Sequence, residues 1–235
     1  MKYEKRIDGR GFEDIRPMEA KVGVIKNAAG SAEFKIGKTH AIAAVYGPRE
    51  LFPKFLQIQN KARLRCHYNM MAFSGSGDRV RPGTSRRSKE ISMVTEKALE
   101  PALDLFTFPK AVVDVYVELV QTDAGTRCAG ICAAALALAD AGFPMKDLVS
   151  AVSAGIVGDK VVIDLDKDEE DFEGGAVDIP IAMIPRTGEI TLLQLDGEVS
   201  KEDLKSALEY GRKACEKIAV VQREALRAKY AEVKK

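Results

Sequence analysis

The sequence has few cysteines and no long apolar run. Its four cysteines are Cys66, Cys128, Cys132 and Cys215, too few and too scattered for the disulfide framework of a small secreted domain. No apolar run approaches the roughly 20 residues that a membrane-spanning helix needs. The first residues, MKYEKRIDGRGFEDIR, are charged throughout and resemble neither a signal peptide nor an anchor. These absences favour a reducing, cytoplasmic setting without a membrane partner.

Motifs for zinc and for nucleotide phosphates are also missing. Cys128 and Cys132 are four residues apart, but no histidine lies near enough in the sequence to complete a zinc set. Packing of small residues is therefore the favoured interpretation of this pair. The GSG at 75–77 lacks the lysine and the strand-then-helix context of a nucleotide-binding loop. His40 falls in an apolar strand pattern, which favours a structural role, and His67 follows a basic strand where it could touch a ligand.

The chain contains no linker, low-complexity run or heptad repeat, so we expect a single domain over residues 1–235. Short alternating or β-branched runs predict strands. They lie at 20–25, 32–37, 40–47, 62–68, 111–121, 150–157, 160–165, 177–184 and 189–197. Helices are predicted from about Ser88 to Leu99, after Thr126, and from Ser200 to about Lys229. Runs of strands between a few helices favour an α+β fold of mixed sheets packed with helices.

Charge is segregated along the chain although the net charge is only +1. Residues 54–89 contain nine basic residues and one acid, a pattern that attracts phosphate backbones but also fits a solvated loop. Residues 164–178 contain eight acids and one lysine, and most of them are expected in a surface loop. Asp178 differs because it stands at the start of the apolar run VDIPIAMI. A carboxylate there suits general acid chemistry or coordination of Mg²⁺.

The stretch DAGTRCAGICAAALALADAG, at 123–142, predicts an anion-binding helix start. Thr126 fits an N-cap, and the first helical amides lack partners within the helix. Backbone amides and the helix dipole can hold an anion there, and Gly125 would allow close approach. The alternative is a well-capped core helix. Together with the pair at 86–87 and Asp178, the stretch favours phosphoryl transfer with free phosphate.

Eight segments in order resemble the RNase PH family, and within it the catalytic subunit of archaeal exosomes. They are RIDGR (6–10), YGPRE (46–50), RCHYNMMAFS (65–74), SRRSKEIS (85–92), DAGTRCAG (123–130), LALADAGFPMKDLV (136–149), VDIPIAMIP (177–185) and LLQLDGEVS (192–200). The resemblance implies the RNase PH fold, of the ribosomal protein S5 domain 2-like type. It implies 3′→5′ degradation of RNA by phosphorolysis, with inorganic phosphate as co-substrate and nucleoside diphosphates as products. The reverse reaction would add 3′ tails.

The same resemblance implies partners. A hexameric ring, a trimer of dimers, would contain a related non-catalytic subunit and carry RNA-binding cap subunits. Two alternatives stay open: a non-catalytic RNA-binding ring subunit, and a stand-alone RNase PH that trims tRNA 3′ ends.

The resemblance also assigns site residues. The phosphate-binding turn would comprise Gly125, Thr126, Arg127 and Cys128, supported by Arg87. RNA would contact Arg63, Arg65, Arg86 and Arg87. Asp178 would be the catalytic acid and Asp171 the second acid, and these two carboxylates could hold Mg²⁺. The spacing between them is seven residues where six is expected, so Glu170 and Glu173 are alternatives to Asp171.

Overall fold

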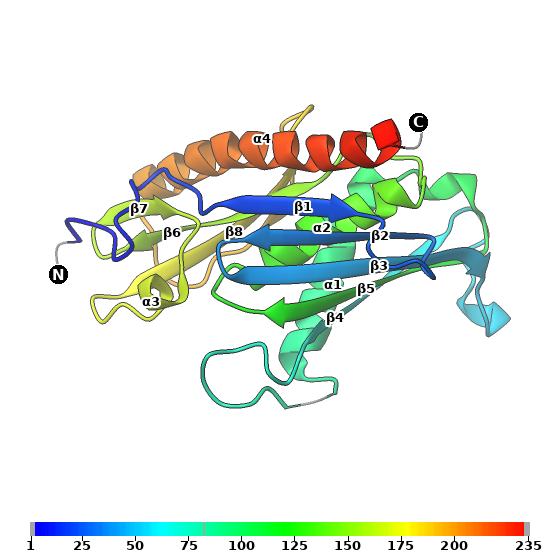
Figure 1. The fold of residues 1–235 in the computed structure, drawn as a ribbon, viewed down its shortest axis with the longest axis horizontal. Coiled ribbons are helices and arrows are strands. Elements are labelled where there is room, and N and C mark those ends of the chain that lie inside the picture. Colours follow the sequence, from blue (N-terminus) through cyan, green and yellow to red (C-terminus); the bar gives the residue numbers. More distant parts are fainter. Residues whose placement is uncertain (1–2, 82, 233–235) are drawn as a thin grey trace.

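A computed structural model describes residues 3–81 and 83–232 as two sheets with helices between and around them (Figure 1). The first sheet has the strand order β1-β2-β3-β5-β4. Its strands are β1 (Met18–Val22), β2 (Gly30–Ile36), β3 (Thr39–Glu50), β4 (Arg63–Met70) and β5 (Ala111–Gln121). Neighbours are antiparallel except β4 and β5. That parallel pair requires a long crossover, which helix α1 (Arg86–Leu99) supplies.

The second sheet has the order β7-β6-β8-β9 and is antiparallel throughout. Its strands are β6 (Ser150–Val157), β7 (Lys160–Ile163), β8 (Ala176–Ile184) and β9 (Glu189–Leu193). Asp178 lies near the start of β8, opposite Gly155 of β6. A Cβ on Gly155 would stand 2.2 Å from the carbonyl oxygen of Val177. Glycine therefore lets β6 lie close to the strand that carries Asp178.

Helix α2 (Thr126–Asp140) contacts both sheets and is buried along nearly its whole length. Its alanines have no bulk to hold the sheets apart, while Ile131, Leu136 and Leu138 are fully buried in the core. A Cβ on Gly130 would lie 3.1 Å from Cγ1 of Val117 on β5. The small residues therefore fix how close α2 lies to the first sheet, and with it where the N-terminus of α2 points.

The remaining helices complete the fold. The long helix α4 (Lys201–Glu232) runs across β1 and β6 (Figure 1). The short helix α3 (Lys167–Glu170) precedes β8. Three 3₁₀ turns occur at Lys54–Leu56, Glu100–Ala102 and Leu105–Thr107. No helix in the described part of the chain is long and apolar enough to span a membrane.

The predicted α+β architecture is confirmed, with three local corrections. Helix α1 begins at Arg86, because Ser85 and Ser88 form a capping box. The N-cap of α2 is Gly125 rather than Thr126. The acidic segment is not simply a surface loop, since it contains α3 and buries Asp164 and Glu169. One buried cluster includes side chains from both sheets, and a single domain over 1–235 stays a prediction.

Candidate active site

The turn before α2 adopts a conformation that exposes the first amides of the helix. Ala124 and Gly125 have φ angles of 55° and 59°, a region that glycine enters readily and other residues seldom. No side chain caps the helix. The N–H groups at this end lack partners in the preceding turn, so they can bind an anion. The sequence-predicted turn at 125–128 therefore has the geometry that the prediction requires.

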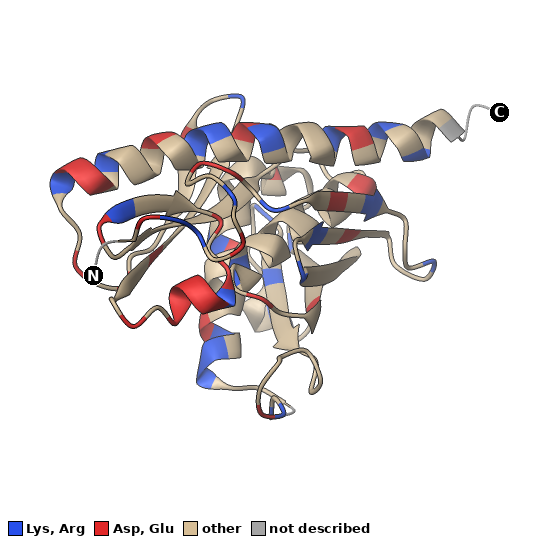
Figure 2. Cartoon of the chain, turned by 60° about the vertical axis from the view of Figure 1, so that its left-hand side comes forward, with Lys and Arg blue, Asp and Glu red and all other residues tan. Residues whose placement is uncertain are grey.

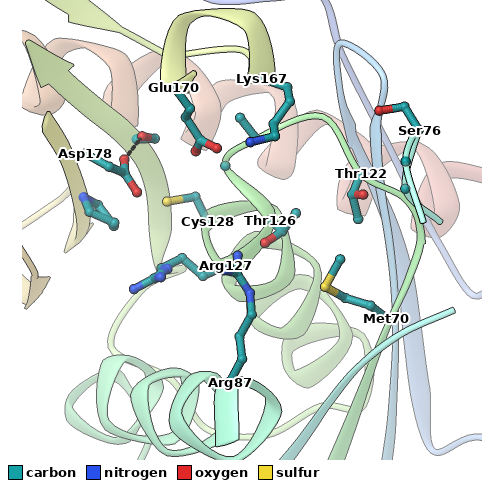
Figure 3. Close-up of a pocket in the computed structure, with 16 residues that line it drawn as sticks. Met70, Ser76, Arg87, Thr122, Thr126, Arg127, Cys128, Lys167, Glu170 and Asp178 are labelled. Atoms are coloured by element: carbon teal, nitrogen blue, oxygen red, sulfur yellow. Dashed lines mark hydrogen bonds between the residues drawn. The ribbon is translucent and has the colours of Figure 1, made fainter. Parts of the chain in front are cut away.

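These residues open onto a cavity of about 270 Å³ (Figure 3). It lies among α2, the loop after β4, the first turn of α1, helix α3 and strands β6 and β8. Its lining residues are Met70, Gly75, Ser76, Gly77, Arg87, Thr122, Ala124, Gly125, Thr126, Arg127, Cys128, Ser153, Lys167, Glu170, Asp178 and Pro180. The loop containing GSG is thus part of the site, although it is not a nucleotide-binding loop of the P-loop kind.

Three cationic side chains line the cavity: Arg87, Arg127 and Lys167 (Figure 3). Arg127 is largely buried and donates a hydrogen bond to Oε1 of Gln194, and it also lies 3.7 Å from a carboxylate oxygen of Glu90. These two groups hold the guanidinium from outside the cavity. The positive charge of Arg127, in the first turn of α2, is therefore fixed in place and suited to an anionic ligand.

Two carboxylates face the same cavity, Asp178 from β8 and Glu170 from α3 (Figure 3). Burial raises the pKa of Asp178, and this effect is opposed by the hydroxyl of Ser153, which donates to Oδ1, and by the charge of Arg127. Burial also raises the pKa of Glu170, and the negative charge of Asp178 raises it further. Raised carboxyl pKa values beside cations suit proton transfer near neutral pH.

The structure does not bring Asp171 into the cavity. Its side chain is exposed, and Oδ1 accepts a hydrogen bond of 2.6 Å from Nζ of Lys167. Asp171 follows the last residue of α3, whereas Glu170 lies within the helix and faces Asp178. The second acid stays a prediction; of the three candidates Asp171, Glu170 and Glu173, Glu170 is the one that lines the cavity, and we carry it forward as the candidate. Glu173 does not line the cavity.

The predicted RNA-contacting arginines divide into two groups. Arg87 lines the cavity, while Arg86 is exposed beside it in the first turn of α1. Arg63 and Arg65 lie on β4 and do not line the cavity. Arg65 donates to both carboxylate oxygens of the buried Asp114, at 2.7 and 3.0 Å. Figure 2 shows the basic start of α1 near the acidic helix α3.

The carboxylates fit Mg²⁺ only as a partial ligand set. Among residues 3–81 and 83–232, no group of three or more His, Cys, Asp or Glu side chains is arranged to hold a metal ion. Magnesium is commonly held by one or two carboxylates together with substrate phosphates. The hard oxygens of Asp178 and Glu170, next to the phosphate-type turn, satisfy that chemistry, whereas Asp171 does not contribute.

Sequence reasoning missed three supporting residues. Lys167 is the only lysine in the acidic segment 164–178, a signal that could have singled it out. Ser153 and Gln194 gave no such signal, because each acts through a partner far away in the chain.

Comparison with known protein families identifies the family of this chain. Residues 14–144 match the model for domain 1 of the 3′ exoribonuclease family, and residues 147–214 match the model for domain 2. The chain belongs to the 3′ exoribonuclease family. The predicted RNase PH resemblance and the predicted class of enzyme are confirmed.

Relatives within the 3′ exoribonuclease family include archaeal exosome components. The exosome complex component Rrp41 of Thermococcus kodakarensis is 50% identical over 229 residues, which cover 97% of this chain and 91% of that protein. Its counterpart in Pyrococcus furiosus is 51% identical over the same length, with 97% and 90% covered. Within the family, this chain therefore resembles archaeal exosome components.

Solved structures confirm the RNase PH fold. Rice Rrp46 superimposes with a TM-score of 0.80 at 26% identity, covering 93% of this chain and 98% of that one. A chain of the Archaeoglobus fulgidus exosome with RNA bound to the active site gives a TM-score of 0.77 at 23% identity, covering 97% and 93%.

Proposed function

We propose that this chain is the catalytic subunit of an archaeal-type exosome core that degrades RNA from its 3′ end by phosphorolysis. One observation supports this most directly. One cavity contains the start of α2, which no side chain caps, the side chains of Arg87 and Arg127, and two carboxylates with raised pKa values. A hydrolase that used water would not need a second anion site beside the scissile phosphate.

In this proposal inorganic phosphate lies on the amides of Thr126, Arg127 and Cys128, with the guanidinium groups of Arg87 and Arg127 around it. A phosphate oxygen attacks the phosphorus of the last phosphodiester, and the bond from phosphorus to the 3′ oxygen of the preceding nucleotide breaks. The products are a nucleoside diphosphate and an RNA shortened by one nucleotide. In the reverse direction the same groups would add 3′ tails.

Asp178 supplies the proton that the departing 3′ oxygen needs. A carboxyl group can donate at neutral pH only if its pKa is raised, and burial has this effect on Asp178. The negative charge of Asp196 raises the pKa of Asp178 further. When Mg²⁺ is bound, the ionised carboxylate of Glu170 would hold it together with phosphate oxygens, whose charge it would offset, while Asp178 carries the proton.

The names of the relatives, exosome complex components, support a proposal for the assembly. We propose RNA as substrate, a related non-catalytic subunit as partner in a hexameric trimer of dimers, and RNA-binding cap subunits on that ring. A cytoplasmic location belongs to the same proposal. Arg63, Arg65 and Arg86, outside the cavity, would contact RNA on its way to the site.

Product analysis tests the reaction. The full chain, alone and mixed with its partner subunit, is incubated with polyadenylate and inorganic phosphate. We expect ADP and strict dependence on phosphate, whereas AMP, or activity without phosphate, would overturn the proposal. Mixed rings with one subunit type mutated at a time address the non-catalytic alternative. The mass of the native assembly addresses the stand-alone alternative.

A further inference from the structure

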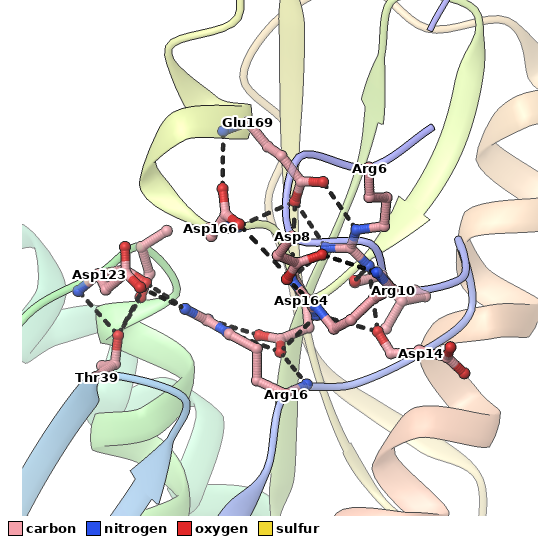
Figure 4. A network of polar contacts seen from close by, with 12 residues as sticks. Arg6, Asp8, Arg10, Asp14, Arg16, Thr39, Asp123, Asp164, Asp166 and Glu169 are labelled. Carbon is pink, nitrogen blue, oxygen red and sulfur yellow. Dashed lines mark hydrogen bonds and ion pairs between the residues drawn. The ribbon is translucent and has the colours of Figure 1, made fainter. Parts of the chain in front are cut away.

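The turn that precedes α2 is held in an uncommon backbone conformation. Ala124 is not a glycine, yet its φ is 55°, and Gly125 follows with φ of 59°. Such a conformation persists only where surrounding groups determine it. The groups that hold this turn, Thr39 and Arg16, do not line the cavity (Figure 4).

Thr39, the first residue of β3, contacts three backbone groups of the turn. Its hydroxyl is fully buried and donates toward the carbonyl oxygens of Asp123 (3.0 Å) and Ala124 (2.8 Å). The same hydroxyl oxygen accepts a hydrogen bond of 3.0 Å from the backbone N–H of Asp123. One hydroxyl therefore binds this turn as both donor and acceptor, with its single proton shared between the two carbonyl oxygens.

Arg16 supports the same turn from the N-terminal segment. Nη1 donates to the carbonyl of Asp123 at 2.5 Å, while Nε and Nη2 donate to the two carboxylate oxygens of Asp164 at 2.9 and 2.7 Å. The side chains of Arg16 and Asp164 are 6% and 2% exposed. Because the Asp164 carboxylate accepts hydrogen bonds from Nε and Nη2 of Arg16, the guanidinium is held rigidly where Nη1 meets the carbonyl oxygen of Asp123.

The Asp123 carboxylate extends these contacts to the acidic helix. Oδ1 accepts a hydrogen bond of 3.3 Å from the backbone N–H of Lys167, the first residue of α3. Oδ2 lies 3.5 Å from Nη1 of Arg16. Helix α3 carries Lys167 and Glu170, both of which line the cavity. Asp123 thus joins the turn before α2 to the helix that carries Glu170.

The geometry of the peptide bond gives these contacts a consequence for binding. In a trans peptide the C=O of one residue and the N–H of the next point in opposite directions. Anchoring the carbonyls of Asp123 and Ala124 inward therefore directs the N–H groups of Ala124 and Gly125 outward. Both residues line the cavity. The same anchoring keeps the carbonyl oxygens of Asp123 and Ala124, which would repel an anion, away from the ligand.

We propose that Thr39 and Arg16 are positioning residues for the attacking phosphate, and that Asp123 couples their turn to α3. The inference rests on the proposed function, since it concerns the same cavity. None of the three residues need touch the substrate. Their effect is on how well the turn is organised before phosphate arrives, so losing them weakens phosphate binding more than RNA binding.

The decisive variant is Thr39→Val, which keeps the shape and removes the hydroxyl. Thr39→Ser tests rescue because it returns the hydroxyl alone. Thr95→Val is the matched control, since Thr95 is also a buried threonine but its hydroxyl has no hydrogen-bond partner among the described residues. Each variant is made in the full chain, assembled with its partner subunit, and its fold is checked by denaturation.

We measure KM for phosphate and KM for polyadenylate, and the affinity for inorganic phosphate by calorimetry. Thr39→Val should raise the phosphate KM about tenfold and change the RNA KM less than about twofold, with Thr39→Ser recovering most of the loss. An unchanged phosphate KM, or equal changes for Thr39→Val and Thr95→Val, would overturn the inference.

Two further outcomes separate this inference from the proposed function. If the unaltered chain binds phosphate but does not use it, and Thr39→Val still weakens that binding, the function fails and the positioning role stands. If Thr39→Val does not fold, Arg16→Lys replaces it, because lysine keeps the charge beside Asp164 but lacks the fork that reaches Asp123. Arg16→Lys must raise the KM for phosphate without an equal rise in the KM for polyadenylate. Equal rises in the two KM values would refute the positioning role.

Discussion

Replacing Ser153 with alanine should shift the pH dependence of the reaction in a predictable direction. The Ser153 hydroxyl donates to the carboxylate of Asp178, which favours the charged form and opposes the increase in pKa caused by burial. A hydrogen bond to a charged group contributes about 1.5–3 kcal/mol. The hydroxyl can also accept a hydrogen bond from the protonated carboxyl. We therefore assign about 1 kcal/mol to the difference between the two forms, or roughly 0.7 pKa units.

The sign follows from the role of Asp178 as a proton donor. Activity is present while Asp178 is protonated and is lost as pH rises through its pKa. Ser153→Ala removes a group that lowers this pKa, so the pKa rises and the basic limb of the kcat profile moves to higher pH by roughly 0.7 units.

The assay is single-turnover phosphorolysis of polyadenylate at saturating phosphate across the pH range. Ser150→Ala is the control, since Ser150 lies on the same strand but bonds to Gln222 rather than to Asp178. A basic limb that stays in place, or moves to lower pH, would refute Asp178 as the proton donor.

Three further predictions concern other parts of the site. Glu170→Gln should lower turnover by about 10²-fold, while Asp171→Asn leaves it unchanged, and the reverse result in the same kinetic assay would restore Asp171 as the second acid. Gln194→Ala, which frees the guanidinium of Arg127, should raise the phosphate KM about five- to tenfold; an unchanged KM would show that Arg127 needs no such support. Arg6→Met removes the 2.6 Å ion pair of the buried Glu169 carboxylate and leaves Arg10 at 4.0 Å as its cation. It should lower the free energy of unfolding by about 3 kcal/mol, measured with denaturant, and a loss under about 1 kcal/mol would contradict this.

The fold could be predicted where local pattern and tertiary environment agree. The β-branched run at 111–121 and the apolar run at 150–157 predict strands with the bounds observed. Helix α3 was missed because four charged residues in an acidic stretch resemble a solvated loop. What orders them is the burial of Glu169 against Arg6, a residue of the N-terminal segment that no local pattern connects to α3.

The candidate site likewise contains features with a local sequence signal and features that depend on tertiary contacts. The residues and the resemblance singled out the turn at 125–128 and Asp178, which line one cavity, because a glycine before a helix and an acid at a strand entrance are local signals. Their roles stay predictions. Spacing could not predict which of Glu170 and Asp171 lines the cavity, since this depends on the direction in which a one-turn helix presents each side chain. The role of Asp123 needed the structure, because its partners Thr39 and Arg16 come from distant parts of the chain.

The origin of the oxygen in the product tests the central claim most directly. The assembled protein is incubated with polyadenylate and ¹⁸O-labelled inorganic phosphate in unlabelled water, and the released nucleotides are analysed by mass spectrometry. We expect ADP that carries the label in its β-phosphate, because phosphate bound at the start of α2 is the proposed nucleophile. Unlabelled AMP, or AMP labelled when the water rather than the phosphate carries ¹⁸O, would contradict it.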